Sequence, residues 1–275
     1  MKKLKTEQSN VLQVNNLSVH MQTKDNTSTL VQDIQFELHR GKVLGIVGES
    51  GSGKTVTSMA ILQLLDQKTT TIEGSIKLQG RELNGLDKKA MRNIRGKDIA
   101  FIMQNPMNAF TPVYTIGNQF IETIRSHTKM NKKQATEIAI EAMQHVNLPN
   151  PKELLTSYPF QLSGGMLQRV MIAMAACLHP AVIIADEPTT ALDVNNQLQV
   201  LHHLNQIRTD YGSAILLISH DLGVISEMAD DVIVMQHGRI VEKADVFQLF
   251  DHPQHEYTKK LLHARPKLHV EEYIG

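Results

Sequence analysis

Cysteine and tryptophan are nearly missing from this 275-residue sequence, which holds one cysteine, Cys177, and no tryptophan. A disulfide between two cysteines of the sequence, or a metal centre built from several of them, is therefore excluded. Cys177 lies in an apolar run from residue 171 to 178. A single thiol in such a run predicts a buried structural residue rather than a reactive one.

Long apolar runs and an excess of one charge are also missing. No apolar run approaches the roughly 20 residues of a membrane-spanning helix, and the lysine-containing first 12 residues have no apolar segment typical of a signal peptide. The 28 basic and 28 acidic residues balance, which argues against a nucleic-acid partner. We therefore expect a globular α/β protein whose role at a membrane, if any, is peripheral.

Short apolar runs of strand length predict a parallel sheet that is covered on both faces. Four of them are Val43–Val47, Ile99–Met103, Val182–Ala185 and Ile215–Ile218. A fifth, Val232–Met235, precedes a turn and is expected to form a hairpin. Alternating residues between positions 12 and 38 predict an antiparallel sheet near the N-terminus.

Between residues 115 and 178 the apolar spacing becomes helical, and prolines divide the segment. Lys132–Val146 is its clearest amphipathic helix, and short helices are expected near residues 245–250 and 257–262. Because apolar strand-length runs flank this block on both sides, it predicts a helical insertion within the α/β core. Polar residues follow all four predicted parallel strands, which places them together at one edge of the sheet, where ligands bind.

The first strand runs into a glycine-rich loop that matches the G-x-x-x-x-G-K-[ST] phosphate-binding pattern, with a helical segment after it. The loop is Gly48-Glu49-Ser50-Gly51-Ser52-Gly53-Lys54-Thr55. Its backbone N–H groups are expected to cradle phosphates, with Lys54 reaching the β- and γ-phosphates and Thr55 offering its hydroxyl to Mg²⁺. The alternative, an accidental glycine turn, is disfavoured by the strand–loop–helix context. Alone, the pattern indicates only a nucleoside triphosphate.

A second small-residue segment, Ser163-Gly164-Gly165, opens a predicted helix that runs to about Leu178. Serine and glycine at a helix N-terminus form another anion-binding cradle. One chain needs a single cradle for the γ-phosphate of its own nucleotide. The second therefore suggests contact with a nucleotide held by a partner subunit, against the simpler interpretation of a helix cap.

These segments, in their order along the chain, resemble the motifs of ABC-type ATPases over about residues 11–265. Leu162–Arg169 resembles the signature sequence, Ala181–Pro188 the Walker B strand, and residues 191–193 the D-loop. The resemblance implies that Asp186 and Gln104 contact Mg²⁺. It also implies that Glu187 polarises the attacking water as general base, and that His220 contacts the γ-phosphate.

The resemblance also implies an architecture and a set of partners. It predicts a RecA-like P-loop core with a parallel sheet, an N-terminal antiparallel β subdomain and an inserted α-helical subdomain. The expected ATP-binding domain spans residues 11–250, with the helical subdomain at 105–180 and a tail at 251–275. ATP and Mg²⁺ are the implied cofactors. The implied partners are a second ATPase subunit, two permeases and, indirectly, an extracytoplasmic binding protein, at the cytoplasmic face of the membrane.

Longer stretches, including the tail His252-Pro253 followed by Tyr257-Thr258, resemble the oligopeptide/dipeptide/nickel importer branch. Residues 104–112, Gln-Asn-Pro-Met-Asn-Ala-Phe-Thr-Pro, are similar to nickel/cobalt–metallophore importers. We therefore expect metal cargo, with peptides as the alternative. A soluble ABC protein of translation or DNA repair and a simple P-loop kinase or GTPase are disfavoured, because tandem cassettes are missing in the first case and the signature segment is present in the second.

One departure from the family concerns the base of the nucleotide. The family usually stacks adenine on an aromatic residue, and Met21 occupies that position here. A thioether packs on a ring with less orientation than an aromatic side chain does, which predicts modest affinity and poor base discrimination. The thirteen histidines include the pairs His202-His203 and His252/His255. Neither pair has nearby ligands that would complete a metal site.

Overall fold

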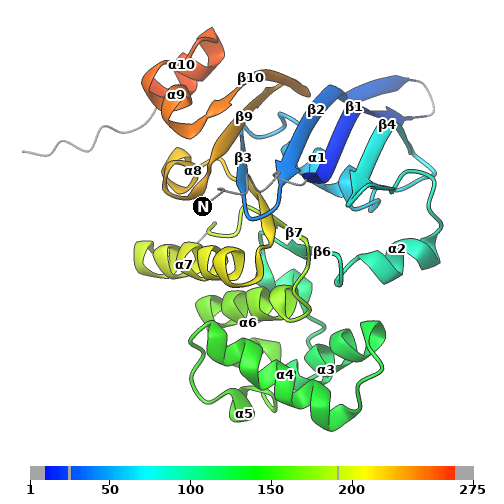
Figure 1. The fold of residues 1–275 in the computed structure, drawn as a ribbon, viewed down its shortest axis with the longest axis vertical. Coiled ribbons are helices and arrows are strands. Elements are labelled where there is room, and N and C mark those ends of the chain that lie inside the picture. The colour runs from blue at the N-terminus through cyan, green and yellow to red at the C-terminus, as the bar shows by residue number, and fades with distance from the viewer. Residues whose placement is uncertain (1–9, 24–25, 191, 264–275) are drawn as a thin grey trace, which may run out of the picture.

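The computed structural model describes residues 10–23, 26–190 and 192–263, arranged as two sheets with helices around and below them (Figure 1). The strands are β1 (Asn10–Gln22), β2 (Thr27–His39), β3 (Val43–Val47), β4 (Thr70–Leu78), β5 (Arg81–Glu82), β6 (Ile99–Ile102), β7 (Val182–Asp186), β8 (Ala214–Ile218), β9 (Asp231–Gln236) and β10 (Arg239–Asp245). The helices are α1 (Lys54–Ile61), α2 (Lys88–Ile94), η1 (Pro106–Ala109), α3 (Ile116–His127), α4 (Lys132–His145), α5 (Pro151–Leu154), η2 (Pro159–Gln161), α6 (Gly164–Ala176), α7 (Val194–Tyr211), α8 (Leu222–Met228), α9 (Val246–Asp251) and α10 (Glu256–His263).

The larger sheet has the strand order β10-β9-β3-β8-β7-β6. Neighbouring strands from β9 to β6 pair in parallel, and β10 closes the hairpin with β9. All five residues of each of β3, β7 and β8 are buried, because helices or the second sheet cover both faces. The four predicted parallel strands and the hairpin are therefore confirmed, with β6 ending at Ile102 rather than Met103.

The smaller sheet has the order β2-β1-β4-β5 and is antiparallel. It confirms the antiparallel sheet predicted near the N-terminus, while β4 and β5 had no alternation strong enough to predict them. Val19 pairs with Val31, but the next residue of β1, His20, pairs with Thr29. Leu30 is thus left over in a β-bulge, a device that redirects a side chain.

Every element between β6 and β7 is helical, as the predicted insertion requires; these helices form the lower half of the view in Figure 1. Two helices end earlier than the sequence indicates. Helix α1 stops at Ile61, before Gln63 at φ 52°, and α6 stops at Ala176, before His179 at φ 52°. A left-handed residue cannot continue an α-helix. The boundaries 11–250 and 105–180 stay predictions, and residues 264–275 of the expected tail lie outside the described residues.

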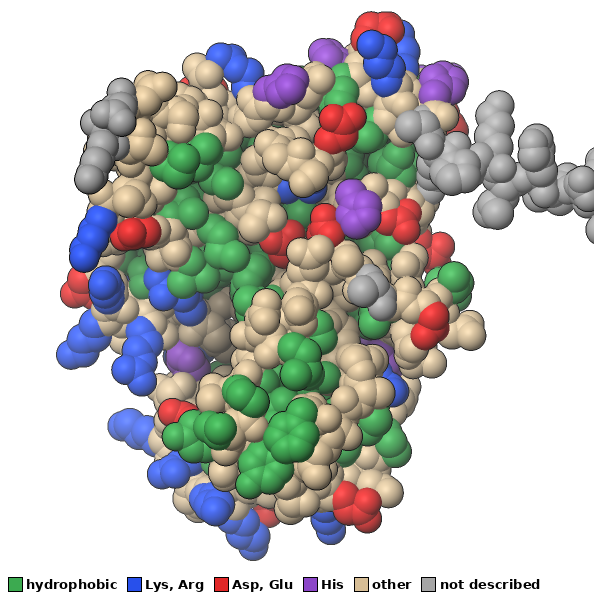
Figure 2. Space-filling view, turned by 180° about the vertical axis from the view of Figure 1, so that it is seen from behind, with side chains coloured by type: hydrophobic (Ala, Val, Ile, Leu, Met, Phe, Trp, Pro, Cys, Tyr) green, Lys and Arg blue, Asp and Glu red, His purple; other side chains and the backbone are tan. Residues whose placement is uncertain are grey.

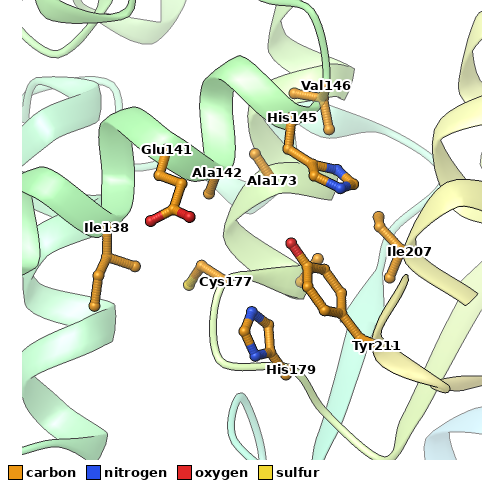
Figure 3. A pocket seen from close by; sticks show the side chains of 11 residues that line it. Ile138, Glu141, Ala142, His145, Val146, Ala173, Cys177, His179, Ile207 and Tyr211 are labelled. Carbon is orange, nitrogen blue, oxygen red and sulfur yellow. The ribbon is translucent and has the colours of Figure 1, made fainter. Parts of the chain in front are cut away.

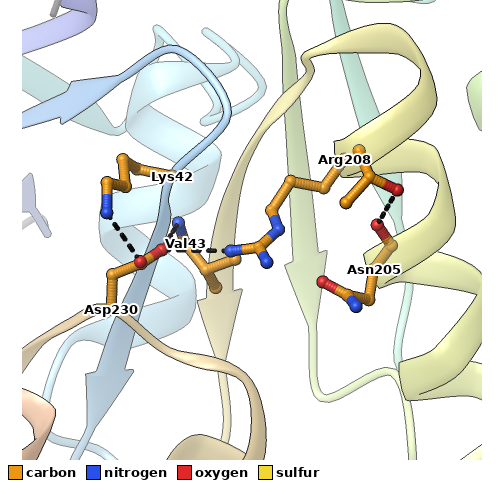
Figure 4. A network of polar contacts seen from close by, with 6 residues as sticks. Lys42, Val43, Asn205, Arg208 and Asp230 are labelled. Atoms are coloured by element: carbon orange, nitrogen blue, oxygen red, sulfur yellow. Dashed lines mark hydrogen bonds and ion pairs between the residues drawn. The ribbon is translucent and has the colours of Figure 1, made fainter.

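The six-stranded sheet separates two hydrophobic cores. One lies between the sheet and helices α3, α4 and α6–α8, with Phe120 and Val170 at its centre, and the other lies between the two sheets, with Phe36 and Ile46. The edge opposite the predicted ligand site is tied by Asp230 (Figure 4). Its carboxylate accepts from Lys42 Nζ and Val43 N, both at 2.8 Å, and lies 3.2 Å from an Arg208 guanidinium nitrogen.

Candidate functional site

A cavity of about 640 Å³ lies at the carboxyl ends of the parallel strands. Several of the predicted site residues line it together, although they come from distant segments of the chain. Its lining is Leu30, Ser50, Gly51, Gly53, Lys54, Thr55, Val56, Gln104, Glu187 and His220. The prediction that polar strand ends meet at one edge is confirmed in its geometry.

The loop between β3 and α1 has the conformation that its glycines allow. Gly48 has φ 153°, and a Cβ there would lie 2.3 Å from the Met235 carbonyl oxygen. Gly53 caps α1 in a left-handed conformation, φ 104°. The loop is therefore curled against β9, a path that a side chain at position 48 would block.

Lys54 is buried at the floor of this loop, and its ammonium donates to Gly48 O at 2.7 Å and to Glu49 O at 2.9 Å. Burial lowers the pKa of Lys54, against the opposing effect of the Glu187 and Asp186 carboxylates. A buried ammonium group whose partners are two neutral carbonyl oxygens can exchange these partners for an anionic ligand, which binds it more strongly.

Asp186 ends β7 and is only 5% exposed. Burial raises its pKa, and a hydrogen bond from Thr55 acts in the opposite direction. Its Oδ1 atom has no hydrogen-bond partner. An unpaired buried carboxylate oxygen beside a threonine hydroxyl is costly in isolation, and a hard divalent cation such as Mg²⁺ would satisfy both oxygens. The residues present therefore fit that ion.

Glu187 is held from three sides. Its carboxylate lies 2.9 Å from His220 Nδ1, and it accepts from Gln104 Nε2 at 3.0 Å and from Thr190 Oγ1 at 2.9 Å. Its backbone is left-handed, φ 50°. A non-glycine residue in this region is uncommon and often functional. The strain turns the chain sharply after β7 and directs the side chain to the cavity.

Sequence reasoning missed three residues of this site. Thr190 and Val56 belong to none of the predicted site motifs, and Leu30 enters the cavity through the bulge in β2. Met21, the residue predicted to pack on adenine, lies on β1 opposite Ser28 and Thr70. Of the residues that line the cavity, Leu30 on β2 is the one that comes from the four-stranded sheet. The role of Met21 stays a prediction.

The second predicted anion-binding cradle, Ser163-Gly164-Gly165, lies at the start of α6 and outside the cavity. Ser163 caps α6 by accepting from Met166 N at 3.3 Å, and both Ser163 and Gly164 are exposed. A Cβ at Gly164 would meet nothing within 4 Å. This segment does not line the cavity of its own chain. It is an open surface, as a site for a partner's ligand requires. Of the D-loop, Ala191 lies outside the described residues.

A smaller cavity of about 260 Å³ lies between α4, α6 and α7 (Figure 3). The rings of His179 and Tyr211 are stacked there, 3.9 Å between centroids, and His145 pairs with Asp210 at 2.9 Å. No group of three or more potential metal ligands occurs among the residues that the structure describes.

The ABC transporter family model matches residues 31–190. A "Probable peptide ABC transporter ATP-binding protein" of Sinorhizobium fredii is 42% identical over 93% of this chain and 77% of its own length. The glutathione import ATP-binding protein GsiA of Escherichia coli is 44% identical over 94% of this chain. The chain spans 42% of the length of that protein.

Two solved structures show the same fold. An ATP-binding cassette solved as a dimer with ADP and Pi in a post-hydrolysis state has a TM-score of 0.76 over 86% of this chain and 98% of its own, at 24% identity. The cbiO1 protein of Clostridium perfringens has a TM-score of 0.74 over 88% and 91%, at 22% identity. The predicted cassette fold, with antiparallel N-terminal sheet and helical insert, is confirmed. The chain belongs to the ABC transporter family, and it is an ATP-binding cassette that hydrolyses ATP to drive transport.

Proposed function

We propose that this cassette energises the import of peptides. The proposal rests on one geometric observation for the reaction: Glu187 is fixed between Gln104, Thr190 and His220, at the mouth of a phosphate-binding loop. For the cargo it rests on the relatives, whose names state peptide transport and glutathione import. These names support the peptide alternative. The nickel or cobalt cargo that residues 104–112 favour has no support from them.

In this proposal the loop of residues 48–55 cradles the phosphates of ATP, and Lys54 moves from its two carbonyl partners to the phosphate oxygens. Thr55, Asp186 and Gln104 would hold Mg²⁺, which when bound neutralises charge on the phosphates. Asp186 Oδ1 is the strongest support for that assignment, because it is buried without a partner.

Glu187 orients the attacking water and accepts its proton, with its carboxylate aligned by Thr190 and Gln104. His220 is 60% exposed, so its ring can turn from Glu187 toward the γ-phosphate. In the arrangement described here the His220 ring instead pairs with Glu187. In this proposal Glu187 is the general base, and His220 contacts the γ-phosphate once its ring has turned.

The second cradle supports a dimer. Ser163 and Gly164 are exposed and Gly165 is half-buried at the N-terminus of α6, where the helix dipole favours an anion. We propose that they contact the γ-phosphate of a nucleotide held by a second ATPase subunit. Two such half-sites would close around two ATP molecules, and hydrolysis would release them.

The segment after Gln104 supports a contact with a permease. Three large apolar side chains of this segment are exposed: Met107 by 46%, Val113 by 71% and Tyr114 by 56%. Figure 2 shows hydrophobic side chains exposed on the helical half of the molecule as well as on the other half. Large exposed apolar side chains that lie close together are typical of protein interfaces. No helix in the described part of the chain is long and apolar enough to cross a bilayer. From the exposed apolar segment we propose that permeases bind the cassette and hold it at the cytoplasmic face of the membrane.

Glu187→Gln tests the reaction. The variant keeps both hydrogen bonds that the carboxylate accepts but is a poor base, so ATP turnover is expected to fall by at least about a hundredfold while ATP still binds. A trapped ATP-bound dimer should then appear in size-exclusion chromatography. Ordinary turnover in this variant would overturn the assignment of Glu187.

The cargo is tested in the reconstituted importer. The cassette is co-purified with its permeases, and its ATPase rate is measured with binding protein loaded with a peptide, with glutathione or with a nickel complex. Stimulation by a peptide supports the proposal. Stimulation by the nickel complex alone would favour the metal reading instead.

A further inference from the structure

The last helix of the described chain contacts the phosphate loop. The Tyr257 hydroxyl on α10 accepts a hydrogen bond from the Glu49 backbone N–H at 3.0 Å, across 208 residues of sequence. The Tyr257 side chain is buried, with 8% exposure. No motif of the nucleotide site includes this residue, which the sequence offered only as part of a tail pattern.

The contact acts on one particular peptide group. Gly48 O and Glu49 N belong to the same peptide unit, and its two ends are held by different residues. The carbonyl end accepts from Lys54 Nζ at 2.7 Å, and the N–H end donates to Tyr257. Because Gly48 has no Cβ, this peptide could rotate at little cost if it were free. Rotation would take Gly48 O away from Lys54.

The remainder of the loop is fastened by the same C-terminal part of the chain. Gly238, in the turn between β9 and β10, donates its N–H to Ser52 O at 3.0 Å. Hydrogen bonds from the hairpin and from α10 therefore fix both sides of the loop. Packing of Gly48 against Met235 adds a steric limit on the same side.

Helix α10 is itself anchored to the hairpin through Glu242 on β10. The Glu242 carboxylate accepts from Gln254 N at 2.7 Å and from His255 N at 3.0 Å, at the start of α10. Burial alone raises the pKa of Glu242, but these hydrogen bonds outweigh it and lower the pKa below its ordinary value. Glu242 is thus ionised at neutral pH and holds the helix in the position from which Tyr257 reaches the loop.

We infer that Tyr257 is a positioning residue of the nucleotide site, which fixes the Gly48–Glu49 peptide and through it the Lys54 ammonium. The C-terminal helix is therefore part of the ATP-binding apparatus rather than an appendage. The inference rests on the proposed role of the phosphate loop. It adds a residue from outside the nucleotide motifs to that loop.

The test is Tyr257→Phe, which removes the hydroxyl and keeps the ring. Binding of MgADP to the purified chain is measured by calorimetry, together with thermal unfolding and steady-state ATPase kinetics. We expect the dissociation constant for MgADP and the KM for ATP to rise about three- to tenfold, with kcat and the unfolding temperature nearly unchanged. Tyr211→Phe, in the cavity of Figure 3, makes the same chemical deletion away from the loop and should bind as the wild type does.

A second variant distinguishes positioning from packing. Glu242→Ala releases α10 from the hairpin and should raise the same dissociation constant. Because both variants disrupt one contact, the double variant should bind no more weakly than the weaker single one. Unchanged MgADP affinity in Tyr257→Phe, an equal loss in Tyr211→Phe, or effects that multiply would each overturn the inference. If the wild type binds no MgADP, the proposed nucleotide function falls as well.

Discussion

Gln168 on α6 and Pro188, in the segment that follows β7, are joined by a buried hydrogen bond. The Gln168 side-chain amide, 1% exposed, donates to Pro188 O at 2.8 Å. Pro188 directly follows Glu187, and Gln168 lies about one turn into the helix that Ser163 caps. The bond therefore links, within one chain, the cradle proposed for a partner's nucleotide to the general base proposed for its own.

Removing this amide should weaken both the fold and the link. In Gln168→Met the Pro188 carbonyl loses its donor in a dry environment, so we expect the free energy of unfolding to fall by about 1–3 kcal/mol. Urea denaturation of the purified chain measures it. Gln199→Met, exposed on α7, is the matched control and should leave stability within about 0.5 kcal/mol of the wild type. Equal stability of the two variants would contradict the role given to this bond.

Variants of Met21 and Leu30 should show whether Met21 packs on the adenine base of the nucleotide. If Met21 packs on adenine, Met21→Tyr should raise ATP affinity about two- to tenfold, through better stacking, and increase the preference for ATP over GTP. Leu30→Ala should lower the affinity in either case, because Leu30 lines the cavity. Equilibrium binding of a fluorescent ATP analogue, with competition by ATP and GTP, measures both. Unchanged affinity in Met21→Tyr would remove Met21 from the site.

The exposed apolar segment after Gln104 should carry the contact with the permeases. Val113→Asp places a charge in the proposed interface, and we expect co-purification with the permeases to be lost while the isolated chain keeps its affinity for MgADP. Phe247→Asp is the matched control, since Phe247 is 77% exposed but lies on α9. Retention of the complex by Val113→Asp, or its loss in both variants, would contradict this surface.

Cys177 gives a pH dependence with a defined sign. Burial raises its pKa to about 12, from 9.0. Above pH 9 the unfolded chain loses the thiol proton while the folded chain keeps it, so stability falls as pH rises from 9 toward 12. Cys177→Ser removes this titration. Between pH 9 and 10.5 the wild type should therefore lose more stability than Cys177→Ser, by at most about 1.4 kcal/mol per pH unit, as chemical denaturation can measure. Parallel curves would mean that the thiol is not buried.

The fold was predictable from sequence wherever local chemistry decides it. Continuous apolar runs such as Val43–Val47 can only be buried strands or helices, and their length decides between the two. The glycine pattern of the phosphate loop likewise requires its left-handed conformations. The same reasoning predicts that Lys54, Asp186 and Glu187 lie at one edge of the sheet.

The features of the fold and of the site that the sequence does not predict depend on contacts between distant segments of the chain. Leu30 enters the cavity because β1 and β2 are out of register by one residue, and register is a property of the pair rather than of either strand. Tyr257 reaches the loop only because Glu242 places α10 there. Glu187 has a left-handed backbone that a sequence pattern for glutamate would not indicate. The positions of Leu30 and Tyr257 and the backbone conformation of Glu187 are determined by contacts with the surrounding structure, and their local sequence does not indicate them.

The central sheet has a mechanical consequence. Ile183 and Ala185 face the helical side, while Val182 and Ile184 face the antiparallel sheet. A layer one strand thick is thus shared by two otherwise separate interiors, and α3 to α5 adhere to only one of them. Because α3 to α5 pack on one core and β1 and β2 on the other, we expect amide exchange in these helices to respond to nucleotide independently of exchange in β1 and β2.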